Sequence, residues 1–574
     1  MSVPSLAQTD ARPDAASAAA TATGTHPALL AVGSALLLWT TFPPADWGWL
    51  VWIALVPFFL LIPSRRSKAS LYFGAWVGGM AFWTLAVQWV RLSDSTAWVA
   101  WLAMAFALSL FWPLFLALSR LAVHRLRLPM MIAAPVIWVA LEYVRAYVVT
   151  GFPWYYLAHS QHSALAVIQI ADIAGSLGVS LVIAVVNAWV VDVLTLPLLT
   201  TSPLGPKLTP RQTVRLFTVI AMVGGTVAYG AFRLATAHFR DGPRVALLQS
   251  SLIQRYKESS NAATLLAIYR RLIERVLEKP ERADLIVWPE TSYPYQFSLI
   301  DPAVDDTVLG EQLARIGPKL TVDFWRSRTE LVAAQLHGWA DTMGVPMLVG
   351  ALTYDHRPAG LSKFNSALLF EPKVATLQSY HKLHLVPFGE YVPLITMFPW
   401  LTVFTPYHGA SAHVPSLDFG REPTVFDLGP YRIATAICFE DTVPQVVQRF
   451  FTETPDGRQP DALLNLSNDG WFHGSSEHEM HLAISIFRAV EHRVPLARAA
   501  NTGVSAIVDG NGRVREMLAT LKEGVVSGIL PLDDRSSYYS AWGDWLGRSC
   551  LAVTIGLVPL GLMRRRERRP RVAT

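Results

Sequence analysis

A series of long apolar runs in the first 240 residues constrains the fold of this chain more than any other feature. A helix needs roughly 17–25 apolar residues to cross a bilayer, and eight runs meet or approach that length. They lie near 27–43, 47–63, 70–91, 97–119, 130–148, 174–198, 216–236 and 546–563. The sequence therefore predicts a membrane domain of about seven helices over residues 27–240 and a final membrane helix over 546–563.

The first two runs are short, and TTFPPADWG (residues 40–48) separates them. They could equally form two spans, a helical hairpin, a buried pair or one re-entrant element. Composition agrees with a membrane protein, because only 16% of residues are charged, against about a quarter in soluble domains. The net charge of +5 does not indicate a nucleic-acid partner, since the basic residues cluster between apolar runs and at the C-terminus.

The positive clusters also predict orientation, because Lys and Arg in short loops stay on the cytoplasmic side. All clusters agree if both termini are cytoplasmic, which puts the polar region 243–533 outside, in the periplasm of a cell with an outer membrane. Residues 1–26 are rich in Ala and Thr, which predicts a disordered segment without a cleaved signal peptide. Residues 564–574 form a basic cytoplasmic tail. The clusters are Arg65, Arg66 and Lys68; Arg120, Arg125 and Arg127; Lys207, Arg211 and Arg215; and Arg564–Arg571.

The polar region 243–533 alternates short apolar runs with amphipathic stretches, which predicts a layered α/β domain. No G-x-G-x-x-G or Walker-type loop follows a strand, so no nucleotide cofactor is predicted. Helical spacing occurs over 261–279, 329–344 and 481–494. The expected strands lie within RVALLQ, ADLIVWPE, PMLVGALTY, SALLFEP, RIATAICFE, DALLNLSND and SAIVDGNG.

Three side chains placed where such strands end could form an activated nucleophile. Cys438 closes the run AIC, Glu290 closes LIVWPE, and Lys382 follows ATLQSYH. Each has an ordinary structural explanation: an inert core thiol, a salt-bridge or helix-cap carboxylate, and a solvated lysine. Together they supply a base, a nucleophile and a cation for an oxyanion, which is enough for acyl transfer.

A metal site is not predicted, although His473, Glu477, His478 and His481 crowd the segment HGSSEHEMH. Two imidazoles at i and i+4 could share a helical face. However, the segment contains no H-E-x-x-H and has no nearby cysteine ligand. With two cysteines in the chain, Cys438 and Cys550, no disulfide framework is implied either.

The order WPE, HKLHLVPFGEYVP and CFED resembles the carbon–nitrogen hydrolase (nitrilase) superfamily, and most closely its apolipoprotein N-acyltransferase branch. GFPWYYLAHSQ (151–161), NLSNDGWF and the basic tail resemble the same branch. The resemblance implies a multi-span α-helical membrane domain plus a nitrilase-like αββα sandwich. It also implies a general base at Glu290, an oxyanion and thiolate stabiliser at Lys382, and a nucleophile at Cys438. Supporting positions are Glu390, Phe439 and Glu440.

Three segments leave their roles open. The family usually has a Trp in the loop where this chain has Tyr256, and the segment 297–328 is longer than the family needs. The apolar segment Leu394–Phe404 could be a lipid-facing arm or lid, or an ordinary core loop.

The resemblance implies a reaction in the bacterial inner membrane that needs no cofactor. An sn-1 acyl chain passes from a phospholipid, typically phosphatidylethanolamine, through a thioester on Cys438 to the α-amine of a diacylated apolipoprotein. The alternative is a membrane-anchored nitrilase-like amidase that uses the same residues with water as acceptor.

Overall fold

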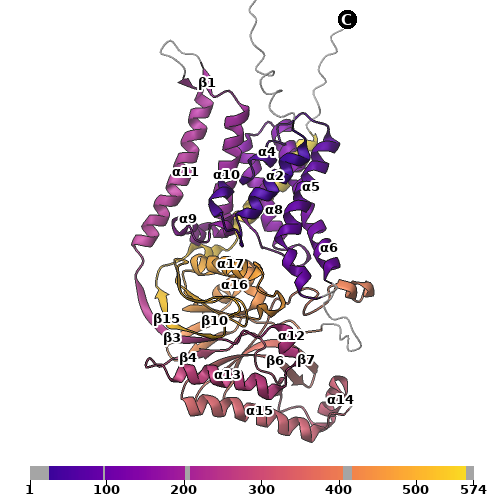
Figure 1. Ribbon diagram of the computed structural model, residues 1–574, viewed down its shortest axis with the longest axis vertical. Coiled ribbons are helices and arrows are strands. Elements are labelled where there is room, and N and C mark those ends of the chain that lie inside the picture. Colours follow the sequence, from indigo (N-terminus) through magenta and orange to yellow (C-terminus); the bar gives the residue numbers. More distant parts are fainter. Residues whose placement is uncertain are drawn as a thin grey trace, which may run out of the picture.

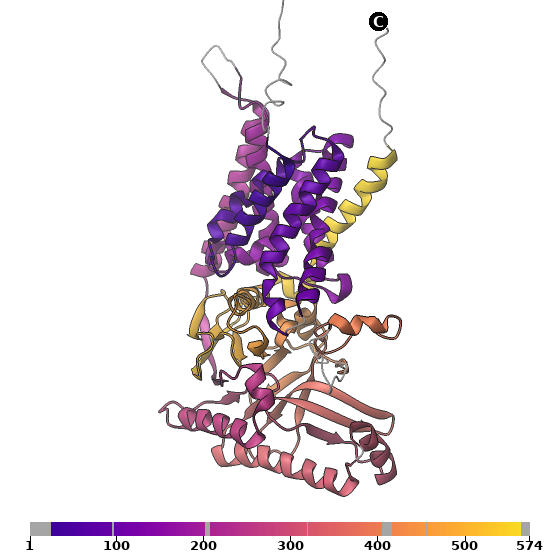
Figure 2. The same ribbon diagram turned by 45° about the vertical axis from the view of Figure 1, so that its right-hand side comes forward.

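The computed structural model describes residues 25–94, 97–200, 207–317, 319–404, 416–454 and 456–563. The predicted tail 564–574 and almost all of the predicted disordered segment 1–26 lie outside these residues. A bundle of apolar helices stands on a domain of two packed β-sheets, and the chain passes from one to the other through α11 and returns through α19 (Figures 1 and 2).

Four helices of the described residues are long and apolar enough to cross a membrane: Trp98–Arg125, Ala171–Thr195 (α10), Pro210–Ala235 (α11) and Trp545–Met563 (α19). The first of these combines α6, α7 and one π-helical turn. The start of α11 has a typical cap, since Thr209 Oγ1 accepts a hydrogen bond from Gln212 N in front of Pro210. The total of eight spans stays a prediction. Within the first long helix, α6 spans Trp98–Ser109 and α7 spans Phe111–Arg120. The other helices of the bundle are α2 (Pro27–Thr40), α3 (Val51–Ala54), α4 (Val56–Phe59), α5 (Lys68–Ala86), α8 (Met130–Arg145) and α9 (Leu165–Ile168).

The first two apolar runs form short helices that polar side chains tie to their neighbours. The backbone N–H of Phe58 donates to Ser34 Oγ at 2.8 Å, and that of Leu55 donates to Asn187 Oδ1 at 2.9 Å. Asn187 Nδ2 in turn donates to the carbonyl of Val51. Because an apolar surrounding offers no water to an open N–H or C=O group, these contacts allow the helix to break between α3 and α4.

The second part is a sandwich of two mixed sheets, as predicted. One sheet has the order β14-β13-β12-β11-β10-β9 and the other β15-β3-β4-β6-β7-β8, with β5 paired to β6. Strands β10, β11 and β12 are parallel, and so are β3, β4 and β6. All seven expected strands are present, in β3 (Phe239–Gln249), β4 (Leu285–Val287), β6 (Met347–Arg357), β7 (Gly360–Phe370), β10 (Tyr431–Ile437), β11 (Ala462–Ser467) and β13 (Ser505–Val508). The remaining strands are β5 (Phe297–Ile300), β8 (Gln378–His381), β9 (Val425–Leu428), β12 (Leu496–Ala500), β14 (Val514–Leu518) and β15 (Gly524–Asp533).

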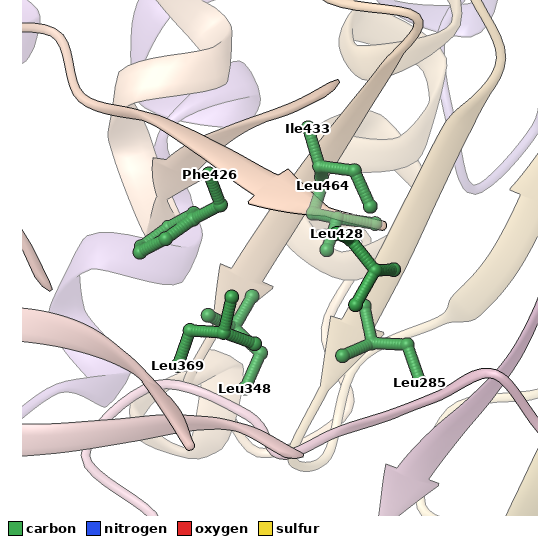
Figure 3. A pocket seen from close by; sticks show the side chains of 7 residues that line it. All are labelled: Leu285, Leu348, Leu369, Phe426, Leu428, Ile433 and Leu464. Atoms are coloured by element: carbon green, nitrogen blue, oxygen red, sulfur yellow. The ribbon is translucent and has the colours of Figure 1, made fainter. Parts of the chain in front are cut away.

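The two sheets meet across a layer of apolar side chains (Figure 3). Leu285, Leu348 and Leu369 come from the larger sheet, and Phe426 and Ile433 are among the residues that face them from the smaller one. A cavity of about 10 Å³ lies among these side chains. The layer is part of the hydrophobic core that the two sheets share.

We expect Leu348→Ala to destabilise the sandwich. Leu348 is 1% exposed, and truncating a buried leucine costs about 2–5 kcal/mol because the cavity it leaves is not refilled. The thermal unfolding midpoint of the purified full chain, followed by intrinsic fluorescence, should fall. Leu277→Ala is the matched control, since Leu277 is 51% exposed. Equal midpoints for the two variants would contradict this account of the core.

Helices cover both outer faces of the sandwich. α13 (Ala262–Leu277) and α15 (Val322–Met343) cover the larger sheet, and α16 (Pro444–Thr452) and α17 (Glu477–His492) lie between the smaller sheet and the membrane bundle (Figure 1). The long segment 297–328 forms β5, α14 (Asp306–Ile316) and the first turns of α15. It has a small core of its own around Leu309, Leu313 and Trp325. The arrangement is the predicted αββα sandwich.

Candidate active site

A buried lysine between two glutamates forms the centre of the site. Lys382 follows β8 and is fully buried. Its Nζ lies 2.9 Å from Glu390 Oε2 and 3.3 Å from Glu290 Oε1. Burial lowers the pKa of Lys382, but the carboxylates of Glu390 and Glu290 together raise it above its usual value. The ammonium group therefore keeps its charge inside the protein.

Two asparagines that the sequence did not single out fix the glutamates. Asn365 on β7 donates from Nδ2 to Glu290 Oε1 at 2.7 Å and to Glu390 Oε1 at 2.8 Å. The backbone N–H of Asn468 donates to Glu290 Oε2 at 2.8 Å. Asn365 had only a weak sequence signal, because it lies next to Ser366 in the polar half of β7, before the apolar run ALLF. For Asn468 the backbone makes the contact, so no side-chain pattern could have revealed it.

Cys438 lies at the end of β10 in a conformation rare for residues with a side chain. Its φ is +53°, a strained value that side chains at functional turns adopt when their surroundings enforce it. Asn465 Nδ2 donates to the Cys438 carbonyl at 3.0 Å. Burial and the nearby charge of Glu290 raise the pKa of Cys438 well above its usual range, although Lys382 lowers it. The thiol therefore rests in its protonated form and needs a base to become a nucleophile.

Glu440 fixes the Cys438 turn to the segment that follows β8 and contains Lys382. Its carboxylate accepts hydrogen bonds from the backbone N–H groups of Ile437, Leu383 and His384 at 2.6–2.9 Å and from the hydroxyl of Tyr380. Phe439 points elsewhere and stacks on the His384 ring at 5.9 Å. Of the six predicted positions, Glu290, Lys382, Glu390 and Cys438 therefore share one cluster. Glu440 organises this cluster, and Phe439 flanks it.

We expect the segment held by Glu440 to resist opening more strongly as pH falls below neutral. Burial raises the pKa of Glu440 to about 7, in spite of Lys382 and its hydrogen-bond donors. The closed state therefore holds a proton on this carboxyl group over a pH range in which the opened, solvated group, with its ordinary pKa of 4.5, has lost it. Protection of the amides of 383, 384 and 437 against hydrogen exchange should rise as pH falls from about 7 toward 4.5, by at most roughly tenfold per pH unit after correction for intrinsic rates.

The pH dependence should disappear in Glu440→Gln, which cannot ionise, and the amides of β6 serve as an internal reference. Protection of the three amides in the wild-type protein that does not change between pH 8 and pH 6 would contradict this role for Glu440.

The membrane bundle meets the sandwich next to this cluster. Trp154, in the segment 151–161, is buried, and its ring lies 5.4 Å from that of His481 on α17. Gln445 Nε2 on α16 donates to the carbonyl of Ala146 at the end of α8. The Cys438 side of the site therefore lies close to the junction between the sandwich and the helices.

Two other expectations concern the edges of the site. The apolar segment Leu394–Phe404 is not a core loop, because Leu394, Met397 and Trp400 are 60%, 67% and 63% exposed. It projects sideways below the bundle (orange in Figure 2). Tyr256 is 46% exposed on the short helix α12 (Gln254–Ser259), and its role stays open.

The histidine-rich segment contributes one carboxylate and one imidazole to a compact acidic group, rather than two imidazoles on one helical face. Glu477 and His481 have ligand-type atoms within 4.8 Å of Asp469, whereas His473 is exposed. Arg498 Nη2 lies 2.6 Å from Asp469 Oδ2 and 2.9 Å from His481 Nδ1. Its guanidinium already supplies the positive charge that a metal ion would bring to these atoms, so the residues do not suit a metal.

The sandwich belongs to the carbon–nitrogen hydrolase family. Residues 244–539 match the carbon–nitrogen hydrolase family model, and residues 34–189 match the apolipoprotein N-acyltransferase N-terminal domain. A carbon–nitrogen hydrolase superfamily protein from Xanthomonas campestris has a similar structure. The similarity covers 56% of this chain and 97% of that protein, with 19% identity and a TM-score of 0.32. Nit3 of Saccharomyces cerevisiae, a nitrilase superfamily member, has 17% identity and a TM-score of 0.34 over 57% of this chain and 98% of its own.

Relatives that match nearly the full length of the chain extend the family assignment to the membrane bundle. The apolipoprotein N-acyltransferase of Geobacter metallireducens is 31% identical over 545 residues, covering 94% of this chain and 95% of the relative. That of Rhodopirellula baltica is 29% identical, over 93% of this chain and 97% of the relative. The chain belongs to the apolipoprotein N-acyltransferase family.

Proposed function

We propose that this protein transfers an sn-1 acyl chain from a phospholipid, through a thioester on Cys438, to the N-terminal α-amine of a diacylglyceryl-cysteine apolipoprotein. The observation that carries the proposal is the cluster of Glu290, Lys382 and Glu390 beside the strained turn of Cys438, at the junction with the membrane bundle. The names of the full-length relatives support an apolipoprotein as the acceptor.

In the first step Glu290 takes the thiol proton and the sulfur of Cys438 attacks the ester carbonyl of the phospholipid. The Lys382 ammonium stabilises the oxyanion of the tetrahedral intermediate. The bond from the carbonyl carbon to the glycerol oxygen then breaks, and that oxygen receives the proton from Glu290. The products are an acyl thioester on Cys438 and a lysophospholipid. A thiol of Cys438 that rests in its protonated form suits this scheme, because Glu290 removes the proton only when the phospholipid is bound.

In the second step the neutral α-amine of the apolipoprotein attacks the thioester carbonyl. The carbon–sulfur bond breaks, an amide forms, and the amine proton returns through Glu290 to the sulfur. A thioester is reactive toward amines, and a surrounding that holds little water protects it from hydrolysis. Both substrates carry acyl chains, which explains why the catalytic domain is mounted directly on membrane helices.

The orientation follows from the same proposal. The positive clusters support a bacterial inner-membrane protein with cytoplasmic termini and a catalytic domain in the periplasm. The cytoplasmic end of α19 then lies at the end of the bundle away from the sheets (Figure 2). The exposed segment Leu394–Phe404 supports a contact with the lipid surface, since large apolar side chains on a surface mark interaction sites. Phosphatidylethanolamine is the proposed donor.

The test uses purified protein and phosphatidylethanolamine with a labelled sn-1 acyl chain. We expect a hydroxylamine-sensitive label on Cys438 that passes to a synthetic diacylated lipopeptide with a free α-amine. Cys438→Ala should take up no label, and Cys550→Ala should behave as the wild type, because Cys550 lies in α19 far from the site in sequence and structure.

The outcomes separate the two candidate activities. Label that reaches the lipopeptide supports the N-acyltransferase. Label that forms on Cys438 but passes only to water would favour the membrane-anchored amidase, and the absence of label on Cys438 would refute the lipid donor. A lipopeptide whose α-amine is already acetylated serves as the control acceptor and should remain unlabelled.

A further inference from the structure

A group of charged or titratable side chains lies buried beside the Cys438 turn, and it includes Glu477, whose Oε1 is 3.4 Å from His481 Nδ1. Asp441, Asp469, His481 and Arg498 are each no more than 1% exposed. Arg498 Nη2 donates to Asp469 Oδ2 and to His481 Nδ1. A guanidinium only donates, so Nδ1 is an acceptor and the ring proton is on Nε2. Nε2 donates this proton to Asp441 Oδ1 at 2.8 Å.

This group holds the Cys438 turn at two points. Asp441 belongs to the same 3₁₀ helix as Cys438, residues 438–442, and is held by His481 and by Ser485 Oγ at 2.6 Å. Arg498 Nη1 donates to Asn465 Oδ1 at 2.7 Å, and Asn465 donates to the carbonyl of Cys438. His481 therefore contacts both residues through which the turn is held. It donates to Asp441, and it accepts from Arg498, which in turn holds Asn465.

The same imidazole meets the membrane bundle. The Trp154 ring lies against His481 with an angle of 51° between the planes. The Trp154 carbonyl accepts a hydrogen bond of 2.6 Å from Arg145 Nη1 on α8, and its ring lies 5.2 Å from that of Trp89. A displacement of this loop is thus passed to His481 by direct packing.

We propose that His481 is a positioning residue that fixes the Cys438 turn and couples its geometry to the seating of the Trp154 loop. Without the imidazole, Asp441 loses a donor. Arg498 Nη1, already 3.6 Å from Asp441 Oδ2, is then drawn toward Asp441 and away from Asn465. The carbonyl of Cys438 is released, and the thiol moves relative to Glu290, Lys382 and Asp469, whose charges act on it.

The test measures the alkylation of Cys438 by iodoacetamide against pH, in full-length protein with Cys550→Ala as background. His481→Leu should shift the profile up by about one pH unit and slow the reaction at pH 8 by roughly tenfold, because the released turn moves the thiol away from the Lys382 ammonium, which lowers its pKa. His481→Gln should recover most of the wild-type profile, since its amide can replace Nε2–H. The exposed His238→Leu is the matched control and should leave the profile unchanged.

Coupling to the membrane bundle is tested with Trp154→Leu and Trp154→Phe. We expect Trp154→Leu to shift the profile in the same direction, Trp154→Phe to shift it less, and the double variant of Trp154→Leu and His481→Leu to match His481→Leu alone. A folded His481→Leu with the wild-type profile would overturn the proposal, and additive effects in the double variant would overturn the coupling. If His481→Leu does not fold, the coupling is tested by the Trp154 variants alone. Equal alkylation profiles for Trp154→Leu and Trp154→Phe would then overturn it.

The relevance of His481 to acyl transfer rests on the proposed function, but alkylation needs no lipid. Failure of the labelled phospholipid to acylate Cys438, with alkylation profiles as expected, would refute the proposed function and leave the role of His481 standing. Alkylation profiles that do not change in the His481 variants, together with normal acylation of Cys438, would refute the role of His481 and leave the proposed function standing.

Discussion

Lys382→Met should nearly abolish formation of the acyl thioester and also destabilise the sandwich. Removing an oxyanion donor alone lowers rates by about 10²–10³, and loss of the ammonium also raises the pKa of the Cys438 thiol further, since Lys382 lowers it. Glu290 and Glu390 would remain side by side without their cation. Breaking a buried ion pair in this way costs roughly 3–5 kcal/mol.

Two measurements on the same preparation check this prediction: single-turnover labelling of Cys438 by the phospholipid, and the thermal unfolding midpoint. Lys363→Met is a matched control, because Lys363 lies on β7 with its ammonium over the Tyr354 ring and outside the cluster. If Lys382→Met acylated Cys438 at the wild-type rate, Lys382 would have no part in the chemistry, whatever its effect on stability.

Glu290→Gln should lower the rate of thioester formation by about 10²–10⁴, the usual contribution of a general base. The thiol of Cys438 rests protonated, so without a base its nucleophilic form is rare. The amide also places a donor among groups that already donate: Asn365 Nδ2 and Lys382 Nζ on one oxygen, and Asn468 N on the other. A conflict of this kind costs about 1–3 kcal/mol.

The diagnostic measurement for Glu290 is the pH dependence of the labelling rate. In Glu290→Gln the residual rate should continue to rise with pH as thiolate forms without assistance, whereas the wild-type rate should level off. Glu278→Gln, on an exposed residue at the end of α13, controls for loss of a carboxylate. A Glu290→Gln profile identical in shape and height to that of the wild type would exclude Glu290 as the base.

Local sequence patterns determined much of this protein. Apolar runs of β type predicted the seven strands because a sheet covered on both faces requires uninterrupted hydrophobic side chains. The length of the longer apolar runs identified the apolar helices. The points where the β-type runs stop located the ends of β4 and β10, where Glu290 and Cys438 lie. The resemblance then added Glu390 and Glu440, which no spacing argument had singled out.

Contacts between distant segments were decided only by the tertiary structure. Asn365 joins Glu290 and Glu390, which are 75 and 25 positions away, and one face of a strand cannot reveal which loops will reach it. The histidine-rich segment illustrates the same limit, since helical spacing suggested only that two imidazoles could share one face, whereas in the fold His481 lies between Arg498 from β12 and Asp441. Propensity and hydrophobic pattern act over a few residues. The charge and hydrogen-bond partners of a buried side chain depend on which strands become neighbours, and only the complete fold determines that.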